Sequence, residues 1–286
     1  MRNQRHSART AKVLVFGAGG RLGTLLQKAW ARNPPQGIAP FYHARNRPRS
    51  GPSDFQWENP TSPLPAADVI IALWGVTSGS DKDLTLNTSL AHASLEAARK
   101  SRARLVLHFS SSAVYGPAQN ATESSPTNPA NAYGHAKLAM EHAISNFPDE
   151  GITHCCLRLA NVVGADSLAP ALRAKTPVKL DRFKDGRGPL RSYVAMGHLA
   201  QVLEKLCAIP RQTLPTILNV ASPEPVEMQA LAEAAGKPIR WQPAPDTAIQ
   251  RVTMEASQLA RLLPKIDPLT TARDMITDWQ QLETMA

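Results

Sequence analysis

Short apolar runs alternate with longer segments of helical periodicity over the first 160 positions of the chain. The runs lie at 12–16, 38–44, 68–73, 104–109 and 154–159. Apolar residues recur at helical spacing in the intervening segments 24–32, 84–101 and 133–146. Short continuous apolar runs are typical of strands that are buried on both faces of a parallel sheet. The alternation predicts an α/β fold with a Rossmann-type, doubly wound parallel sheet.

A glycine-rich turn follows the first predicted strand. Gly17, Gly20 and Gly23 have the spacing G-x-x-G-x-x-G and precede a helical segment, with Arg21 and Leu22 between them. A strand, a glycine turn and a helix in this order form a dinucleotide-binding unit, in which the helix N-terminus holds the phosphates. We expect Gly17 to permit the turn, Gly20 to let the backbone approach a pyrophosphate, and Gly23 to allow close helix packing. A turn without a ligand is the alternative.

The second predicted strand ends at an arginine, where proteins that bind NAD carry an acidic residue. An acid there holds the ribose 2′-hydroxyl of NAD, whereas an arginine accommodates the 2′-phosphate of NADP. Arg45 follows the strand and Arg47 lies close behind it. A guanidinium suits a phosphate, so the pattern favours NADP over NAD, with a solvated basic loop as the alternative. Leu73 and Trp74, at the end of the strand 68–73, belong to the same predicted cofactor site.

Two later stretches supply hydroxyl groups and a cation. The serines at 110–112 follow the strand 104–109, at the sheet edge where open α/β sheets bind ligands. Tyr133 and Lys137 are four residues apart, so on a helix they lie on one face. A cation beside a phenol favours the phenolate. We therefore expect Lys137 to lower the pKa of Tyr133 and to make it an acid or base near neutral pH.

The pattern becomes irregular beyond position 166. It contains short elements broken by proline, a basic glycine-rich segment at 179–191, a strand at 217–220, and helices around 198–208, 226–235 and 254–263. We expect this third of the chain to determine substrate specificity. The predicted organisation is a disordered basic tail at 1–11, a dinucleotide-binding domain at 12–165, and a small, mainly substrate-binding α/β part at 166–286. Some segments of that last part return to the first domain.

Charge and composition narrow the functional classes. The net charge is +9, and most of the excess comes from two clusters, at 2–12 and 45–49. Aromatic residues make up only 5% of the chain, so the charge indicates a local anion site and a basic tail, and not a nucleic-acid surface. Because the chain has no apolar run of membrane length and no apolar stretch after its basic start, we expect a cytoplasmic protein without a membrane segment. The three cysteines lack metal spacing, so we expect buried thiols and no metal.

Together these stretches resemble the extended short-chain dehydrogenase/reductases, the NAD(P)-dependent epimerase/dehydratase family that acts largely on nucleotide sugars. Residues 110–116 resemble its S-S-x-x-V-Y-G stretch, which implies Ser111 as the catalytic hydroxyl and Ser112 as a substrate contact. Residues 158–164 resemble R-x-x-N-V-Y-G, whose Asn, here Asn161, often touches substrate. Residues 191–200 resemble R-x-F/Y-V-H-V-x-D-x-A, whose Arg, here Arg191, commonly holds a substrate phosphate.

The resemblance implies a mechanism for the Ser111, Tyr133 and Lys137 set. Tyr133 would exchange a proton with the substrate oxygen, Ser111 would hydrogen-bond that oxygen, and Lys137 would also bind the nicotinamide ribose. The 4,6-dehydratases of the family place an Asp-Glu pair directly after the catalytic Thr. Ser112 and Ala113 stand there in this chain and cannot do that work, so dehydration is disfavoured.

Three other departures from the family concern the substrate site. The cysteine that GDP-fucose-synthase-like epimerases use near the serines is missing, which disfavours C3/C5 epimerisation. His198 stands at the usual Asp of the late segment, and Val163 at the Tyr of N-V-Y-G. We therefore expect an atypical substrate pocket.

Three functions remain open at this point. The first is an NADP-dependent reductase of a carbonyl on a nucleotide sugar or a similar polar small molecule. The second is a nucleotide-sugar 4-epimerase with tightly held NAD, and the third is a non-catalytic NADP-binding sensor. The two enzymes would share their catalytic residues, so only the handling of the cofactor separates them. The resemblance also allows a homodimer through the helices that follow Gly75 and Asn131.

Overall fold

The computed structural model describes residues 10–43, 54–55, 57 and 63–285. The basic cluster at 45–49, and with it the predicted phosphate ligand Arg45, lies outside the described residues. The first described strand begins at Ala11, so this residue belongs to the sheet and not to the predicted tail.

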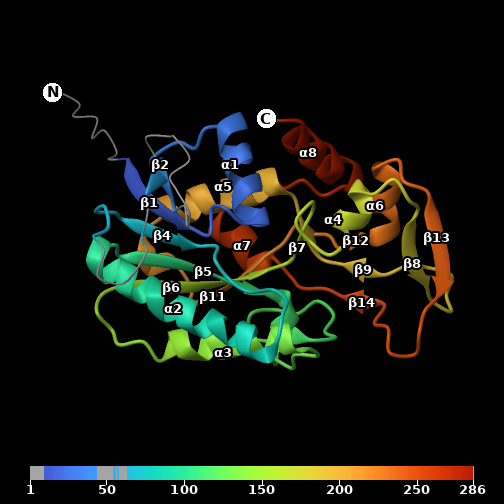
Figure 1. The fold of residues 1–286 in the computed structure, drawn as a ribbon, viewed down its shortest axis with the longest axis horizontal. Coiled ribbons are helices and arrows are strands. Elements are labelled where there is room, and N and C mark those ends of the chain that lie inside the picture. Colours follow the sequence, from blue (N-terminus) through green and yellow to red (C-terminus); the bar gives the residue numbers. More distant parts are fainter. Residues whose placement is uncertain (1–9, 44–53, 56, 58–62, 286) are drawn as a thin grey trace.

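Seven parallel strands form the central sheet, in the order β11-β6-β5-β4-β1-β2-β3 (Figure 1). Their bounds are β1 (Ala11–Phe16), β2 (Ile38–His43), β3 (Asp54–Phe55), β4 (Val69–Ala72), β5 (Leu105–Ser111), β6 (Thr153–Leu159) and β11 (Ile217–Val220). β1 pairs with β2 on one side and with β4 on the other, so the strand order reverses beside β1. Ligands of doubly wound sheets bind at such a reversal. The predicted fold class is confirmed.

Helices cover both faces of the sheet in the described structure (Figure 1). α1 (Arg21–Arg32) and α5 (Met196–Ala208) lie on one face, and α2 (Asp81–Ser101) and α3 (Ala132–Ser145) lie on the other. α2 begins three residues earlier than predicted, because its first turn is polar and carries no apolar pattern. Ser80 and Asp83 form a capping box there, which satisfies N–H groups at the start of the helix.

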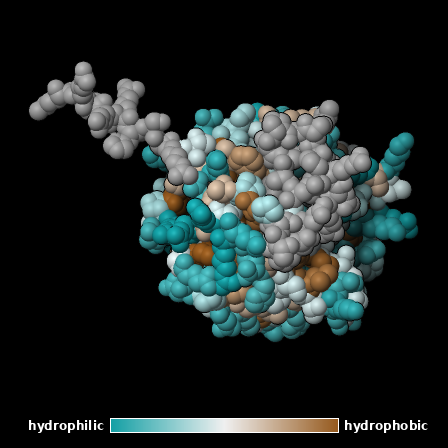
Figure 2. Space-filling view, turned by 60° about the vertical axis from the view of Figure 1, so that its left-hand side comes forward, coloured by the Kyte–Doolittle hydropathy of each residue, from teal (hydrophilic) through white to brown (hydrophobic). Residues whose placement is uncertain are grey.

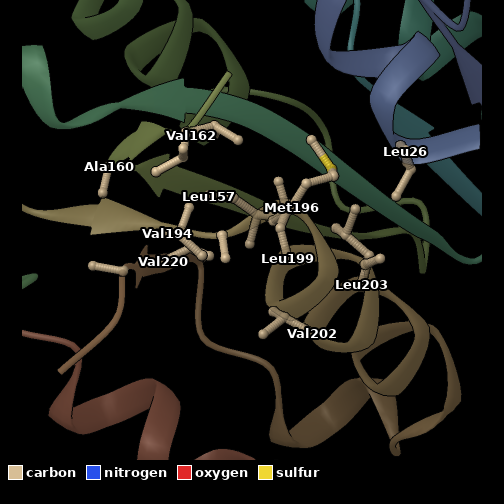
Figure 3. Close-up of a cluster of buried hydrophobic side chains, with 14 of the residues drawn as sticks. Leu26, Leu157, Ala160, Val162, Val194, Met196, Leu199, Val202, Leu203 and Val220 are labelled. Carbon is tan, nitrogen blue, oxygen red and sulfur yellow. The ribbon is translucent and has the colours of Figure 1, made fainter. Parts of the chain in front are cut away.

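The two faces of the sheet have separate cores. Val13 and Val15 belong to the larger cluster, beneath α1 and α5, whereas Leu14 and Phe16 belong to a smaller cluster on the α2 side. Successive side chains of a strand point to opposite faces, so a continuous apolar run is needed to fill both cores. The larger cluster joins the sheet to α5 and the carboxyl-terminal part (Figure 3). The members of this cluster that the figure labels are Leu26, Leu157, Ala160, Val162, Val194, Met196, Leu199, Val202, Leu203 and Val220.

Short elements fill the carboxyl-terminal part. Its bounds are β7 (Asn161–Val162), α4 (Ala169–Arg173), β8 (Val178–Arg182), β9 (Leu190–Arg191), β10 (Tyr193–Val194), β12 (Val226–Glu227), α6 (Met228–Ala234), β13 (Ile239–Pro243), β14 (Arg251–Val252), α7 (Ser257–Leu262) and α8 (Ala272–Thr284). Two 3₁₀ turns, η1 (Ser112–Tyr115) and η2 (Arg211–Thr213), complete the described structure. Most of these elements lie to one side of the central sheet, whereas β11 joins the sheet itself (Figure 1).

The structure corrects two helices predicted in this part. The segment predicted as a helix over 226–235 begins as the strand β12, because Val226 pairs with Arg191. The helix predicted over 254–263 is shorter, since Met254 forms a bridge with Ala121 and α7 starts only at Ser257. Both differences arise from pairing with residues that are distant in the sequence.

The surface that lies at the left of Figure 1 is mostly hydrophilic, with scattered hydrophobic residues (Figure 2). None of the helices in the described part of the chain has the length and apolar character of a membrane span.

Candidate active site

The turn after β1 has the geometry that the glycine spacing predicted. Gly17 has a φ of +81°, and a Cβ on it would lie 2.5 Å from the Trp74 backbone nitrogen. A Cβ on Gly23 would lie 2.5 Å from the Gly17 carbonyl oxygen. Only glycine adopts the first conformation without strain, and only a residue without a side chain allows the second approach. Gly17 and Gly23 therefore fix the turn and the packing of α1 upon it.

The start of α1 fits a dinucleotide phosphate. Gly19 and Gly20 are exposed, and a Cβ on Gly19 would have nothing within 4 Å among the described residues. In the described structure α1 has no side-chain cap and no acidic residue in its first turn. Exposed N–H groups at a helix start without a competing carboxylate favour a bound anion.

Four further residues of the predicted cofactor site lie in or beside this turn, namely Arg21, Leu22, Leu73 and Trp74. The Arg21 guanidinium donates to the Ala165 carbonyl at 3.1 Å, which ties the glycine loop to the segment after β7. Leu22 packs against the larger core. Leu73 donates its N–H to the Phe16 carbonyl at 3.0 Å, and Trp74 Nε1 donates to Ser94 Oγ at 3.0 Å. Leu73 and Trp74 therefore lie directly against the glycine turn.

The predicted catalytic side chains come from two elements. Ser111 ends β5, and its Oγ accepts a hydrogen bond of 3.2 Å from the N–H of Ala113 in η1. Tyr133 and Lys137 lie one turn apart on α3, whose first turn is capped by the Asn131 side chain. The Lys137 Nζ lies 6.0 Å from the centroid of the Tyr133 ring. The Ser111 hydroxyl acts on the phenol as a hydrogen-bond partner that favours its ionised form.

The prediction that Lys137 lowers the pKa of Tyr133 is wrong in this structure. Burial raises the pKa of the phenol above its usual value, and only the hydrogen bond with Ser111 opposes this. Burial also lowers the pKa of Lys137 to about 8, against the opposing charge of Glu141. The spacing predicts two side chains on one helix face, but it does not reveal that Tyr133 is half-buried and Lys137 fully buried. Tyr133 is therefore protonated at neutral pH.

Asn87 lies buried beside Lys137, near the start of α2. Its amide donates to the carbonyls of Val76 and Leu84 at 3.0 and 2.9 Å, and it accepts the Val76 N–H at 3.2 Å. A Cβ on Gly75 would lie 3.0 Å from Asn87 Oδ1 and 3.1 Å from Lys137 Nζ. Asn87 is thus a packing determinant that shapes the turn after β4 around the lysine.

A small pocket lies next to η1. Its lining residues are Ser112, Tyr115, Asn161, Ser192, Val252, Thr253 and Met254. The structure thus brings together two of the three predicted substrate residues, Ser112 and Asn161. The sequence analysis missed Val252–Met254, which reach the pocket because Thr253 exchanges backbone hydrogen bonds with Ala118 and Ala121. No local pattern could have revealed a pairing between segments so far apart.

Arg191, the third predicted substrate residue, does not line this pocket. Its guanidinium donates to the carbonyls of Leu190, Ile249 and Gln250, at 2.8, 2.8 and 2.7 Å. Burial lowers the pKa of Arg191, against the charges of Tyr193 and Asp181. In this structure Arg191 therefore holds the segment that leads into the pocket wall.

Metal ligation finds no support in the described part of the chain, where no cluster of three His, Cys, Asp or Glu side chains could hold an ion. The three cysteines are buried free thiols, as predicted.

Comparison with known proteins identifies the class. The sequence profile of the NAD dependent epimerase/dehydratase family matches residues 13–204, well over half of the chain. With the fold and the glycine loop, this match defines an enzyme of the short-chain dehydrogenase/reductase superfamily that uses a nicotinamide dinucleotide. More narrowly, the chain belongs to the NAD-dependent epimerase/dehydratase family. No curated protein sequence matches the chain significantly.

Solved structures share the fold at low sequence identity. MoeE5, determined with UDP-glucuronic acid and NAD, has a TM-score of 0.75 and 20% identity, over 95% of this chain and 98% of that one. The UDP-glucose 4-epimerase of Thermus thermophilus, in complex with NAD, has a TM-score of 0.73 and 20% identity, over 96% and 100%. TunA, an NAD dependent NDP-hexosamine 5,6-dehydratase of tunicamycin biosynthesis, has a TM-score of 0.74 and 17% identity, over 95% and 98%.

Proposed function

We propose that the protein is an NADP-dependent reductase of a carbonyl group on a nucleotide sugar or a similar polar small molecule. The observation that carries this proposal is the meeting of three groups at the carboxyl edge of the sheet. Ser111, Tyr133 and Lys137 lie there together, and a pocket lined by Ser112 and Asn161 adjoins them. A nicotinamide dinucleotide on the glycine loop would supply the hydride for the substrate carbon.

Tyr133 is the proton donor in this proposal. Burial raises the pKa of its phenol, which keeps the Oη protonated at neutral pH. A group that is protonated at the working pH suits a reduction, because the carbonyl oxygen must gain a proton. The raised pKa thus supports reduction more than oxidation of an alcohol, where the phenol would have to lose its proton first.

Ser111 and Lys137 complete the proposed site. The Ser111 hydroxyl faces Tyr133 and would hydrogen-bond the same substrate oxygen, which holds that oxygen at the proton donor. Lys137 is 4% exposed and donates to the Phe109 carbonyl, which leaves further N–H groups for a ribose hydroxyl. The same bond to Phe109 would hold α3, and with it Tyr133, beside Ser111.

The preference for NADP rests on Arg45, at the position where an acidic residue would hold the ribose of NAD. NADPH usually serves reduction, so the cofactor and the reaction direction agree. The substrate class rests on the family and on three related folds whose structures or descriptions name nucleotide sugars or an NDP-hexosamine.

A nucleotide-sugar 4-epimerase is the second candidate, because a related fold is a UDP-glucose 4-epimerase in complex with NAD. Such an enzyme would use the same three side chains but would retain its cofactor through each turnover. A non-catalytic sensor is less well supported, since the Ser111, Tyr133 and Lys137 set is intact.

Identification of the nucleotide in freshly purified protein separates the two enzymes. The protein is denatured, the released nucleotide is identified, and the emptied protein is titrated with NADPH and NADH. The reductase proposal expects little bound nucleotide, tighter binding of NADPH, and NADPH oxidation by 4-keto nucleotide sugars. The result would support the epimerase instead if stoichiometric NAD survived purification, 4-epimers were interconverted and no net NADPH oxidation occurred.

A further inference from the structure

A buried polar network lies directly behind the proposed active site, and none of the steps above uses it. The Glu141 network comprises Ser110 of β5, Glu141 of α3, Arg158 of β6, Tyr115 of η1 and Asn219 of β11. All five residues are at most 5% exposed. A carboxylate and a guanidinium at this depth are costly to desolvate, so a pair that persists there needs complete hydrogen bonding.

The contacts of Glu141 meet this requirement. Its Oε1 accepts from Ser110 Oγ at 2.5 Å and from Arg158 Nε at 3.0 Å, and its Oε2 accepts from Arg158 Nη2 at 2.7 Å. The Arg158 guanidinium lies 4.7 Å from the centroid of the Tyr115 ring. Tyr115 Oη in turn donates to Asn219 Oδ1 at 2.7 Å.

The network joins the elements that carry the proposed catalytic groups. Ser110 immediately precedes Ser111, and Glu141 follows Lys137 by one turn on the same helix. The hydrogen bond between Ser110 and Glu141 therefore connects the end of β5 to α3. At its other end, Tyr115 forms part of the pocket wall. A displacement of α3 relative to β5 would change the distance between Ser111 and Tyr133.

The carboxylate also bears on the charge of Lys137. The ammonium is 4% exposed, and among the described residues it donates to the Phe109 carbonyl and the Met140 sulfur. Burial favours the neutral amine, whereas the charge of Glu141 favours the ammonium. Glu141 follows Lys137 by four positions on α3, so the two side chains share a helix face, although the direct ion-pair partner of the carboxylate is Arg158.

We propose that Ser110 and Glu141 are positioning residues that hold Ser111 at the Tyr133 hydroxyl and keep Lys137 charged. The inference rests on the proposed function, since it assigns a task to groups that support proton transfer. An ion pair that only stabilised the fold would have the same effect on the melting temperature. Melting temperatures alone therefore do not distinguish a positioning role from a purely structural one.

Two variants with matched controls test the proposal. Ser110→Ala removes one hydrogen bond and leaves the ion pair intact, and its control is Ser101→Ala, a fully buried serine of α2 that donates to the Ala97 carbonyl. Glu141→Gln removes the buried charge, and its control is Asp278→Asn, which changes a buried carboxylate that pairs with the partly buried Arg32 at the end of α1. Each variant is measured for melting temperature, for single-turnover hydride transfer between pH 5 and 10, and for NADPH affinity over the same range.

The proposal expects Ser110→Ala to slow hydride transfer by about tenfold, the scale of a small displacement in the site, whereas Ser101→Ala leaves the rate unchanged.

Glu141→Gln and Asp278→Asn both lower the melting temperature. Only Glu141→Gln moves the alkaline limb of the rate and of NADPH affinity to lower pH, because the lysine then loses its proton more easily. Unchanged rates in Ser110→Ala and unchanged pH profiles in Glu141→Gln would reduce the network to a structural role. If Glu141→Gln does not fold, the rate of hydride transfer in Ser110→Ala alone tests the positioning role of the network.

The NADPH titration separates this proposal from the proposed function. If the wild-type protein transferred no hydride to any keto sugar, the proposed function would fail. A shifted pH dependence of NADPH affinity in Glu141→Gln, absent in Asp278→Asn, would still assign the network its effect on Lys137. Identical titrations in the two variants would overturn the assignment.

Discussion

Lys137 donates a hydrogen bond of 2.7 Å to the backbone carbonyl of Phe109, two residues before Ser111. This bond ties the middle of α3 to the end of β5. Because Tyr133 lies one turn before Lys137 on α3, the bond also sets where the phenol lies relative to the serine. The lysine therefore orders the site through the backbone, in addition to any contact with a cofactor.

Burial of Lys137 has a consequence for stability. Its folded pKa, about 8, lies below the usual value of 10.5, so the folded state binds fewer protons than the unfolded state between these values. Stability then rises with pH across this window, and at pH 7 the buried ammonium costs roughly 3 kcal/mol. We expect Lys137→Met to melt higher than wild type at pH 7, with the advantage declining above pH 8.

Melting curves at pH 7 and pH 10 check this expectation, with the exposed Lys175→Met as the control for loss of a surface charge. If Lys137→Met and wild type differed in melting temperature by the same amount at both pH values, burial would not lower the pKa of Lys137. The same variant should lose hydride transfer by roughly 100-fold or more, because it loses both the bond to Phe109 that places Tyr133 and the donor for the nicotinamide ribose.

The glycine loop offers a pair of variants that add the same methyl group. A methyl on Gly17 would clash with the backbone of Leu73 and Trp74, and alanine would also have to adopt the unfavourable φ of +81°. A methyl on Gly19 would meet no described atom within 4 Å. We expect Gly17→Ala to lower stability by about 1–3 kcal/mol and to weaken NADPH binding severely. Gly19→Ala should keep the stability of the wild type. Chemical denaturation and NADPH titration measure both effects, and equal stabilities would mean that the turn is not fixed as described.

The cofactor preference depends on Arg45. If its guanidinium holds the 2′-phosphate, Arg45→Ala should weaken NADPH binding by roughly 10-fold or more and leave NADH binding nearly unchanged, since a charge-assisted hydrogen bond contributes about 1.5–3 kcal/mol. Titration of the emptied protein with both cofactors measures the difference. If Arg45→Ala weakened the binding of NADPH and NADH equally, Arg45 would not be the ligand of the 2′-phosphate.

Much of the fold follows from local sequence, and the failures have a common physical origin. The strand Ile217–Val220 agrees with its prediction residue by residue, because three of its four side chains are apolar and two of them are β-branched. The local pattern predicts a helix at Met254, whereas in the structure this residue pairs with Ala121 and Ser192, which lie more than sixty positions away. Long-range pairing of this kind leaves no local pattern in a single sequence.

The site shows the same division. Spacing indicated Tyr133 and Lys137, the family resemblance indicated Ser111, and the three lie close to one another in the structure. Their ionisation was misjudged, because the pKa of Tyr133 depends on burial, and a helical spacing does not reveal burial. Glu141 was missed for a related reason. A carboxylate one turn after Lys137 signals a buried ion pair only when its partner, Arg158 on β6, is known to face it.

Single-turnover hydride transfer by Tyr133→Phe tests the central claim most directly. The variant retains the ring and its packing but has no proton to give to the substrate oxygen. With NADPH and a 4-keto nucleotide sugar, we expect the rate to fall by roughly 100-fold to 10,000-fold while NADPH affinity changes by less than about twofold. Hydride transfer at the wild-type rate would contradict the assignment of Tyr133 as the proton donor.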